Sequence, residues 1–479
     1  MLSSLEISSR ALKAQQLGLE ITSNNIANVN TPGYTRQAPI LSQTDPRNVM
    51  KVSIGTGTVI SSLKNFRDEN LDRELRNALS RQSGFAYDSK IFQQIQTAIQ
   101  EPSDYGLDAS FDKFFQSVEQ LSNKPDDVSL RSNLLAKARA LTGTFTTLGR
   151  NLQDVRQQVY GQLESNVSTT NRLLAGIADV NAAISTTSTG SESTSNVLVD
   201  KQSTLIEELS KLGNVTVQRT PTGAVTVSLN GLIVVNNGDR MNMSLSRAMD
   251  PLTGEVSAQI NILDPGKNVV GSFKPAVGEM ASQMRLFNET LDDRELSSAF
   301  SLPRNLNDLA RGFADAVNAV SARGYGLDDP AGTPPGRPFF VSSDAGDITA
   351  ISIAVNPELY DDVRRIPAAA TARTPGENSI IRAIGQLVND TSVMDGMTGR
   401  EYYGATLTEF SNIGAESASG QAVSDAAVQQ IGTQRENITG VNMDEEALNM
   451  IKYQRAFEAA ARMVNATSDM MKSIINLGN

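Results

Sequence analysis

Residues 440–479 read GVNMDEEALNMIKYQRAFEAAARMVNATSDMMKSIINLGN, a pattern typical of a long amphipathic helix. No Pro or Gly occurs from Met443 until Gly478, so nothing interrupts a helix. Asn442 can cap its start, Glu445 follows at capping-box spacing, and the first turn is acidic, as the helix dipole favours. Apolar residues recur every seventh position and predict a seam that another helix must cover. The row is Met450, Phe457, Val464 and Met471, with Ile475 beside it.

The first 28 residues repeat this design. Ser3 and Glu6 have capping-box spacing, and an apolar row again recurs every seventh position. That row is Leu5, Leu12, Leu19 and Ile26. The spacing fits a terminal coiled coil, and equally the outer helices of an ordinary bundle. Two narrow seams do not compensate the conformational entropy of ordering about 60 residues, so we expect these helices to be loose in the monomer and ordered by neighbouring subunits.

Charged residues on the two terminal stretches suggest one polar contact. If the helices run antiparallel, Arg10 and Lys13 lie near Asp469. We therefore predict a weak polar clamp between them, worth about 0–1 kcal/mol.

Composition narrows the class of protein. The chain has 479 residues and a net charge of −11, with no basic block, so nucleic acid is not an expected partner. No run of about 18 apolar residues is present, so we expect no membrane insertion. The N-terminus has no basic region followed by an apolar core and hence no cleaved secretory signal, although some export routes read uncleaved termini.

The residues that carry most enzyme chemistry are missing. Cys, His and Trp are absent, which excludes thiolate nucleophiles, imidazole bases and zinc–thiolate sites. The acidic pairs at 292–293 and 361–362 read as solvated carboxylates, and 328–329 lacks the spacing of a calcium loop. The pair Gly55 and Gly57 lacks the rest of a nucleotide loop. We therefore predict no enzyme activity, no catalytic residue, no metal site and no cofactor.

The interior of the chain is dominated by helical periodicity. Residues 128–184 give the longest signal, with apolar steps of four and three from Leu134 to Val159. Leu163 and Val167 then follow at two steps of four, a local shift of the heptad. Such stripes indicate the core of a rod-like bundle. Further helices are predicted at 66–99, 110–121, 196–212, 278–296, 306–322, 377–389 and 405–438.

A period of two interrupts the helices between residues 213 and 273. Alternating Val, Ile and Thr residues predict strands, with turns at Thr222-Gly223 and Asn230-Gly231. This segment predicts a small all-β module inserted into a helical chain. Residues 49–62 predict a short hairpin or extended arm, and 185–195 a polar loop.

The predicted fold is mainly α with an inserted small all-β domain, in a nested, elongated, multidomain chain. The terminal coiled-coil domain comprises residues 1–45 with 440–479. A helical rod domain comprises 46–212 with 278–439, in which 330–376 form an irregular loop with short strands. The β domain comprises 213–277.

Short motifs at both ends carry a resemblance to a known family. Residues 24–37 read NNIANVNTPGYTRQ, and 440–446 read GVNMDEE ahead of YQRAF at 453–457. These motifs resemble the two ends of bacterial flagellar axial proteins, the family of rod and hook subunits. The residues that carry the motif are Asn24, Asn25, Asn28, Gly33, Tyr34, Arg36, Gly440, Asn442 and Asp444.

An internal pattern of the family is present in weakened form. Asn196, Leu198, Asp200 and Leu205 fit its Asn-x-Leu-x-Asp-x-Arg-Asp-x-Leu pattern. Gln202-Ser203 replaces the Arg–Asp pair, so any ion pair made there by relatives is in doubt for this chain.

The resemblance implies a structural subunit whose termini line the centre of a tube and whose middle faces outward. The sequence GYTRQ at 33–37 is similar to the hook-associated proteins of the hook–filament junction. Implied partners are copies of itself, the flagellar hook protein, hook-associated protein 3, a flagellar export chaperone on the C-terminal helix and the type III export apparatus. The implied location is secreted, in the extracellular flagellum at the hook–filament junction. The alternatives are a hook or distal-rod subunit and, more remotely, a surface enzyme carried on axial-protein ends.

Overall fold

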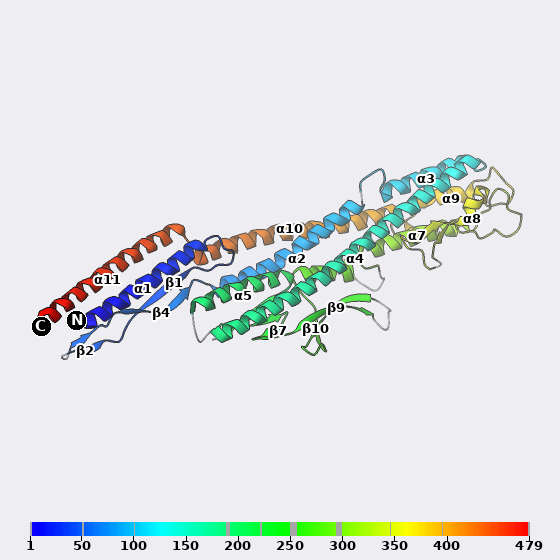
Figure 1. The fold of residues 1–479 in the computed structure, drawn as a ribbon. Coiled ribbons are helices and arrows are strands. Elements are labelled where there is room, and N and C mark those ends of the chain that lie inside the picture. Colours follow the sequence, from blue (N-terminus) through cyan, green and yellow to red (C-terminus); the bar gives the residue numbers. More distant parts are fainter. Residues whose placement is uncertain are drawn as a thin grey trace.

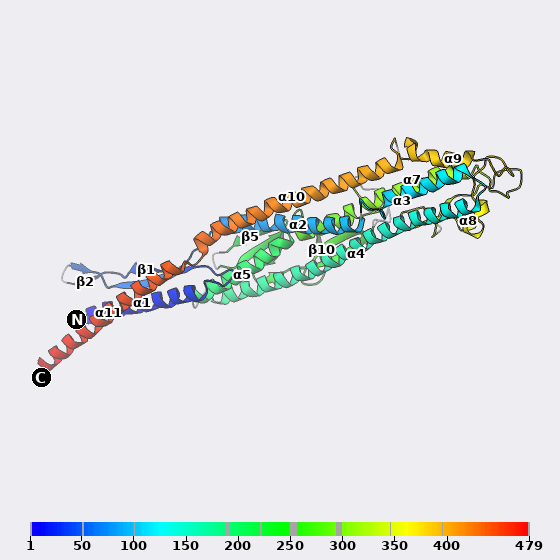
Figure 2. The ribbon, with the colours of Figure 1, turned by 90° about the horizontal axis from the view of Figure 1, so that it is seen from above.

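A computed structural model of the protein describes residues 2–49, 52–99, 101–187, 192–220, 223–249, 256–293, 299–344, 346–394 and 396–477. The molecule is elongated, and both termini lie at one end (Figures 1 and 2). Helices α1 (Leu2–Ala27) and α11 (Met443–Leu477) form that end. Long helices run from there to the far tip, and small antiparallel sheets lie beside them. The predicted mainly helical, elongated fold with inserted β structure is confirmed.

Helices α1 and α11 pair in antiparallel fashion (Figure 1). Gly18 faces Tyr453, and Asn25 bonds to Glu446, which fixes the register. A Cβ atom on Gly18 would lie 2.7 Å from the Tyr453 ring, so the missing side chain allows the close approach. The predicted N-cap of α11 is present, because Asn442 Oδ1 accepts the N–H of Asp444 at 2.9 Å.

The two seven-residue rows lie at the edge of this contact. Leu5, Leu12, Leu19 and Ile26 are half-buried, as are Met450, Phe457, Val464 and Met471. The side chain of Ile475 lies outside the described residues. The buried faces hold mostly small or polar residues together with the larger apolar Ile21: Ser8, Ala14, Ile21, Thr22 and Asn25 on α1, and Glu446, Ala460 and Thr467 on α11. Small residues at the centre let the helices approach closely and turn the larger side chains outward.

The clamp predicted between Arg10 or Lys13 and Asp469 is wrong. Arg10 pairs with Glu6 at 2.7 Å, and Asp469 pairs with Lys472 at 3.5 Å. The helices do run antiparallel, but their register separates Arg10 from Asp469 by about eight residues, roughly 12 Å along the axis.

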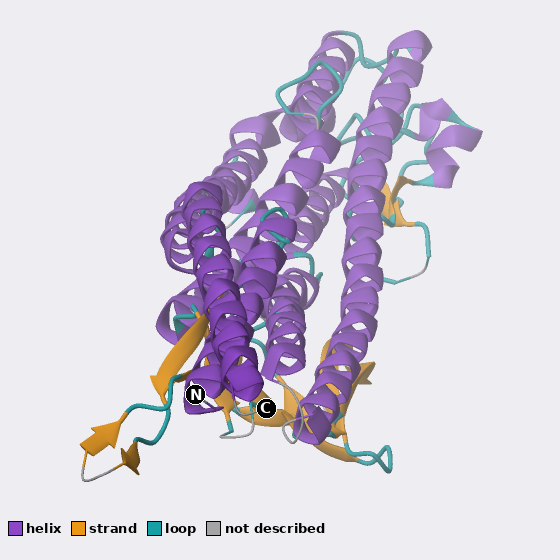
Figure 3. Ribbon diagram, turned by 60° about the vertical axis from the view of Figure 1, so that its left-hand side comes forward, coloured by secondary structure: helices purple, strands orange, loops and turns teal. Residues whose placement is uncertain are grey.

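A two-stranded ribbon extends the terminal end. Strands β1 (Gln37–Gln43) and β4 (Thr58–Asn65) pair antiparallel beside α1, and a small hairpin of β2 (Arg47–Val49) and β3 (Val52–Ile54) continues them (Figure 3). A boundary at residue 45 would cut this ribbon. We therefore propose a terminal unit of residues 1–65 with 440–479, and use that name below.

The rod is a bundle of long helices. Its longest member, α4 (Val128–Thr187), spans 60 residues, and every predicted stripe residue from Leu134 to Val167 is buried. Figure 2 shows α2, α4 and α10 running along the molecule. The rod helices are α2 (Glu69–Ile99), α3 (Leu107–Asn123), α4, α5 (Glu192–Leu212), α6 (Glu279–Arg285), α7 (Leu302–Ser321), α8 (Pro357–Asp361), α9 (Ser379–Gln386) and α10 (Gly399–Thr439).

The β module forms two sheets against the rod. One has the order β5-β6-β7-β8 and the other β11-β10-β9. Asn181 of α4 donates to the carbonyls of Val225 and Asn237, and Asn171 donates to Met243. The module therefore shares the rod's core. Its strands are β5 (Val215–Arg219), β6 (Val225–Leu229), β7 (Leu232–Asn236), β8 (Asp239–Arg240), β9 (Asn242–Met249), β10 (Val256–Leu263) and β11 (Val269–Phe273).

Some predicted boundaries shift. The helix expected at 278–296 is α-helical only as far as Arg285 and continues as a π-helical turn, Leu286–Thr290. Parts of the predicted helix, loop and turn lie outside the described residues, namely residues 294–298, 188–191 and 221–222. Within 330–376 two short strands pair, β12 (Phe340–Ser342) and β13 (Ile353–Val355).

One hydrophobic core runs through the rod and the β module. Its buried residues extend from Tyr87 to Phe410, and among the described residues none comes from the terminal unit. The terminal unit contributes few fully buried apolar side chains of its own, namely Ala14, Ile21 and Ala460. The two parts are therefore held together by something other than a shared apolar core.

Candidate functional site

The motif residues of the two chain ends meet at one hub, where α1 ends and α10 passes into α11. Asn25, only 1% exposed, lies at its centre. Its Nδ2 donates to Gln37 O at 2.8 Å and to Glu446 Oε2 at 3.0 Å. Its Oδ1 accepts the Tyr34 hydroxyl at 2.8 Å and the Gln37 N–H at 3.2 Å. One amide thus connects the end of α1, the following loop and the start of α11.

Arg36 connects the same elements through charge. Its Nε lies 2.8 Å from Glu446 Oε1, and a terminal nitrogen lies 2.9 Å from Glu445 Oε2. Its backbone N–H donates to Thr439 O at 2.9 Å, and its guanidinium stacks on Phe66. The acidic first turn of α11 therefore serves two purposes, because it complements the helix dipole and binds this arginine.

The remaining motif residues shape the loop. Asn28 Nδ2 donates to Asn24 O at 2.9 Å and so satisfies a carbonyl at the end of α1. Gly33 has φ +79°, and a Cβ there would lie 2.7 Å from Thr204 Oγ1. There is also no room for a side chain at position 440, since a Cβ atom on Gly440 would lie 2.4 Å from the carbonyl oxygen of Glu436. Asp444 has an exposed side chain at the start of α11.

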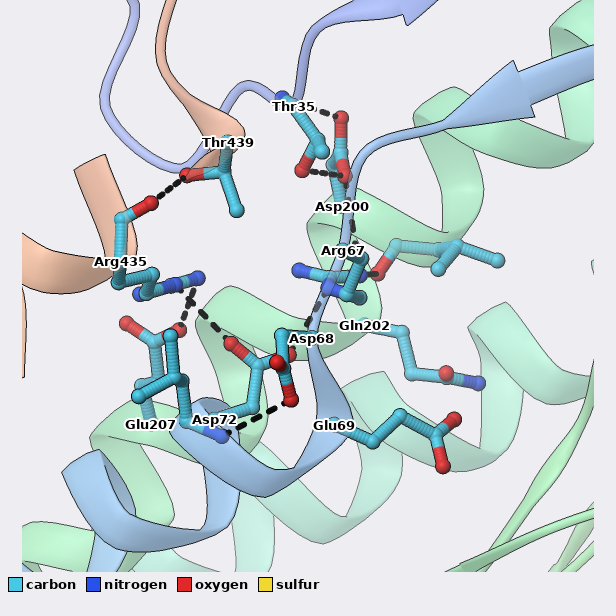
Figure 4. Close-up of polar contacts among 12 residues, drawn as sticks. Thr35, Arg67, Asp68, Glu69, Asp72, Asp200, Gln202, Glu207, Arg435 and Thr439 are labelled. Carbon is cyan, nitrogen blue, oxygen red and sulfur yellow. Dashed lines mark hydrogen bonds and ion pairs between the residues drawn. The ribbon is translucent and has the colours of Figure 1, made fainter. Parts of the chain in front are cut away.

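A second polar cluster lies beside the hub and reaches into the rod (Figure 4). Asp200 of α5 accepts the Thr35 hydroxyl at 2.8 Å and the Thr35 N–H at 3.2 Å. Arg67 lies 3.7 Å from Asp200 Oδ1 and 2.9 Å from Asp72 Oδ2. Arg435 of α10 pairs with Asp72 at 3.0 Å and with Glu207 at 2.8 Å. Alternating charges thus link the loop, α2, α5 and α10.

Burial shifts the pKa of two groups here. Desolvation, with Asp200 and Glu446 nearby, raises the pKa of Tyr34 to about 12, so its hydroxyl remains protonated and donates to Asn25. Desolvation also raises the pKa of Asp200, against the opposing effects of the Thr35 hydrogen bonds and Arg67. Tyr34 thus holds the side chain of Asn25, and Asp200 holds the backbone and side chain of Thr35.

Sequence reasoning found only part of this site. It singled out Asn25, Tyr34 and Arg36 but assigned no contact to Glu446, which was read only as favourable to the helix dipole. Asp200 matched a family pattern without a role, and Arg435 was not singled out at all. Each motif contains an acidic residue that could have been recognised as a candidate for such a contact. Its partner could not be predicted, because Thr35 and Asp200 are 165 positions apart in the sequence and Arg36 and Glu446 are 410 apart.

Other kinds of site receive no support from the described side chains. In the described ranges, no three acidic residues converge as a metal site would require. No helix among the described residues is long and apolar enough to cross a membrane.

The hub gives a matched pair of substitutions. Glu446→Gln removes a buried charge from Arg36, and we expect it to weaken the terminal unit by about 1–3 kcal/mol. Glu445→Gln removes an exposed partner of the same arginine and is expected to cost less than about 1 kcal/mol. Amide hydrogen exchange along α1 and α11 measures the difference. Equal loss of protection in both variants would contradict the role given to Glu446.

The fold and the hub define a class: an axial subunit in which the two chain ends form one helical unit, joined by polar contacts to a rod that carries inserted β structure. The profile described as the flagellar hook-associated protein FlgK helical domain matches residues 92–340. The chain belongs to the flagellar hook-associated protein FlgK family. It is a structural protein of the bacterial flagellum, an extracellular appendage.

Further comparisons agree along the whole chain. The profile of flagella basal body rod proteins matches residues 5–35, and that of the flagellar basal body rod FlgEFG protein C-terminal region matches 433–477. Flagellar hook-associated protein 1 of Bacillus subtilis (strain 168) is 27% identical, over 98% of this chain and 97% of its own. The protein of that name from Escherichia coli (strain K12) is 23% identical, over 97% and 98%. The flagellar hook junction protein FlgK from Burkholderia pseudomallei has a similar fold, with a TM-score of 0.64 at 14% identity, covering 77% of this chain and 100% of that one.

Proposed function

We propose that this chain joins the flagellar hook to the filament and assembles by packing its terminal helices among those of neighbouring copies. The observation that carries this proposal is a set of apolar side chains on α11 that α1 leaves uncovered, which we call the outer row of α11. Its members are each at least half exposed: Leu448, Ile451, Met463, Met470 and Ile474. So many exposed apolar side chains on one helix suit a contact between copies.

The sequence-predicted seam fits the same arrangement. The rows from Leu5 to Ile26 and from Met450 to Met471 are half-buried at the margin of the α1–α11 contact. Neighbouring copies packed around the terminal unit on several sides would also bury these margins. The terminal helices would then gain their rigidity within the assembly, and amide exchange in the isolated protein should be fast at their outer ends. Strong protection there would overturn this part of the proposal.

Specific partners follow from the junction role. We propose the hook protein on one side and hook-associated protein 3 on the other, with the junction itself as the location. Export would proceed through the type III apparatus, with a chaperone covering α11 before assembly. The exposed row of α11 supplies an apolar surface of the kind that a chaperone must cover. We propose no catalytic role for the chain, in keeping with a sequence without Cys or His.

A deletion strain tests the junction role. Electron microscopy is expected to show intact hooks that carry no filament. Cells without hooks would instead support a hook or distal-rod subunit. A hydrolase screen of the complete protein tests the more remote alternative of a surface enzyme.

Phe457→Asp probes the inner margin of the terminal unit. Phe457 is half-buried in the α1–α11 pair, and a carboxylate there disfavours both that pair and packing by a neighbour. We expect a folded rod and β module, loss of protection in α1, and non-motile cells. Circular dichroism and a soft-agar motility assay measure these outcomes, and normal motility would count against the assembly model.

A further inference from the structure

A groove lies between α3 and α9 at the tip of the rod, far from the terminal unit (Figure 1). It is open to solvent and has a volume of about 410 Å³. Its floor is apolar, with Val118 and Ile381 buried and Phe115 and Val388 half-buried. A Cβ atom on Gly385 would lie 3.4 Å from Val118 Cγ1, so a side chain there would fill the floor. The groove is thus an apolar surface that the described part of the chain leaves uncovered.

The two rims of the groove carry opposite charges. Glu119 of α3 and Arg382 of α9 line it, and both side chains are exposed. Neither has an ion-pair partner among the described residues. Asp112, farther along the α3 rim, is instead paired with Arg400 at 2.8 Å. A complementary partner is therefore apolar in its middle, with a cation toward α3 and an anion toward α9.

The turn between β10 and β11 supplies this combination. It reads DPGKNVV from Asp264 onward, and Lys267 is exposed. Val269 and Val270 are 62% and 56% exposed. Asp264 accepts the backbone N–H of Asn268 at 2.8 Å and its side-chain amide at 3.0 Å. These bonds give the turn a defined shape before any partner binds, which lowers the entropic cost of docking.

Side-chain amides close other parts of the sheet that carries this turn. Asn171 of α4 accepts the N–H of Met243 on β9 at 2.7 Å and donates to its carbonyl at 2.8 Å. Asn288 does the same for Ala258 on β10, at 2.8 and 3.1 Å. Among the described residues, β11 pairs only with β10. The turn and β11 are therefore a part of this sheet that remains available to a partner.

We propose that the turn of one copy, residues 264–270, docks in the α3–α9 groove of a second copy. Lys267 then lies beside Glu119, and a valine of the turn covers the apolar floor. Asp264 lies beside Arg382. The turn and the groove are far apart along the molecule, so one chain cannot make this contact with itself (Figure 1). A contact between different surfaces of successive copies continues into an open array. The inference rests on the proposed assembly of copies and adds a contact made by the rod and the β module.

The natural absence of cysteine makes a cross-linking test direct. Gln116→Cys in the groove and Val269→Cys on the turn, combined in one full-length chain, should give a ladder of disulfide-linked multimers when isolated flagella are mildly oxidised. Each single variant should give no band larger than a dimer. The matched control combines Gln116→Cys with Met249→Cys, which is 67% exposed at the opposite end of the same sheet and should give no ladder. No ladder in the test pair, or an equal ladder in the control, would overturn the proposal.

A charge exchange tests the pairing of the rims in the same cysteine background. Lys267→Glu should reduce the ladder roughly two- to fivefold, because the new carboxylate faces Glu119. Glu119→Lys should reduce it similarly, and the two substitutions together should restore it. Both positions are exposed, and circular dichroism of the purified chains establishes that they fold. An unchanged ladder in Lys267→Glu, or no recovery in the combined variant, contradicts the proposed docking. The junction role fails separately, in the deletion strain, where missing hooks would reassign the subunit and leave the cross-linking result readable.

Discussion

Leu448→Asp is expected to leave the isolated protein folded and to abolish the attachment of filaments to the hook. Leu448 is 68% exposed on the outer face of α11, so the substitution removes little from the monomer. Aspartate at this position lies four residues after Asp444, and the repulsion between the two carboxylates costs only about 0.2–0.5 kcal/mol. In the assembly, each copy would lose about 1.5–3 kcal/mol of apolar burial, and a carboxylate would have to be desolvated as well.

Gln454→Asp is the control for this experiment. Gln454 is exposed on the same helix, is polar and not a member of the outer row, and gains the same charge. Motility and electron microscopy of cells, with the amount of exported protein measured alongside, separate assembly from expression. Filaments on Leu448→Asp cells at the wild-type frequency would show that the outer row of α11 is not an assembly surface. A loss of filaments in both variants would point to charge alone.

Phe114→Ala is expected to produce the largest loss of stability, about 3–5 kcal/mol. Phe114 is fully buried on α3 near the tip of the rod. Its ring lies 5.5 Å from that of Phe313 on α7, with Phe339 and Phe340 at 6.2 and 6.0 Å. Truncation leaves a cavity where several rings meet from separate parts of the chain, and these rings cannot all move to fill it.

Tyr105→Ala provides the comparison. Tyr105 is 83% exposed beside the same helix, and its truncation should change the free energy of unfolding by less than about 0.5 kcal/mol. Urea unfolding followed by circular dichroism measures both variants. Similar midpoints for Phe114→Ala and the wild-type protein would show that the aromatic cluster does not stabilise the rod tip.

Local sequence was sufficient where one face of a helix is buried along its whole length. The stripe of α4 follows steps of three and four without interruption, so its periodicity predicts both the helix and the buried side chains. The start of α11 was equally predictable, because Asn442 and the acidic turn act on their own helix. The motifs at the two ends predicted the family for a similar reason, since each is contiguous.

Periodicity was less informative where small residues make the contact. The leucine row of α1 predicted the seam, but Ala14 and Gly18 lie closer to α11. A similar fit occurs at Gly420 of α10, where a Cβ would lie 2.6 Å from the Phe85 ring on α2. A hydrophobic pattern gives weight to large side chains, whereas close helix packing depends on the absence of a side chain at one position.

Ion-pair partners could not be predicted, because they depend on register between distant segments. The antiparallel arrangement suggested Arg10 with Asp469, yet a shift of about 12 Å leaves each with a neighbour on its own helix. The same dependence on register brings Glu446 to Asn25 and Arg36, and Asp200 to Thr35.

Periodicity and short contiguous motifs were enough to predict the helices, the inserted β segment and the family to which the chain belongs. The tertiary structure was needed to show that the β module shares the rod's core, that α1 leaves apolar side chains of α11 uncovered, and that the rod's core takes no described side chain from the terminal unit. Each of these depends on how segments hundreds of residues apart are oriented, and the free energy that sets such orientations comes from contacts between the segments, which no single stretch of the sequence contains.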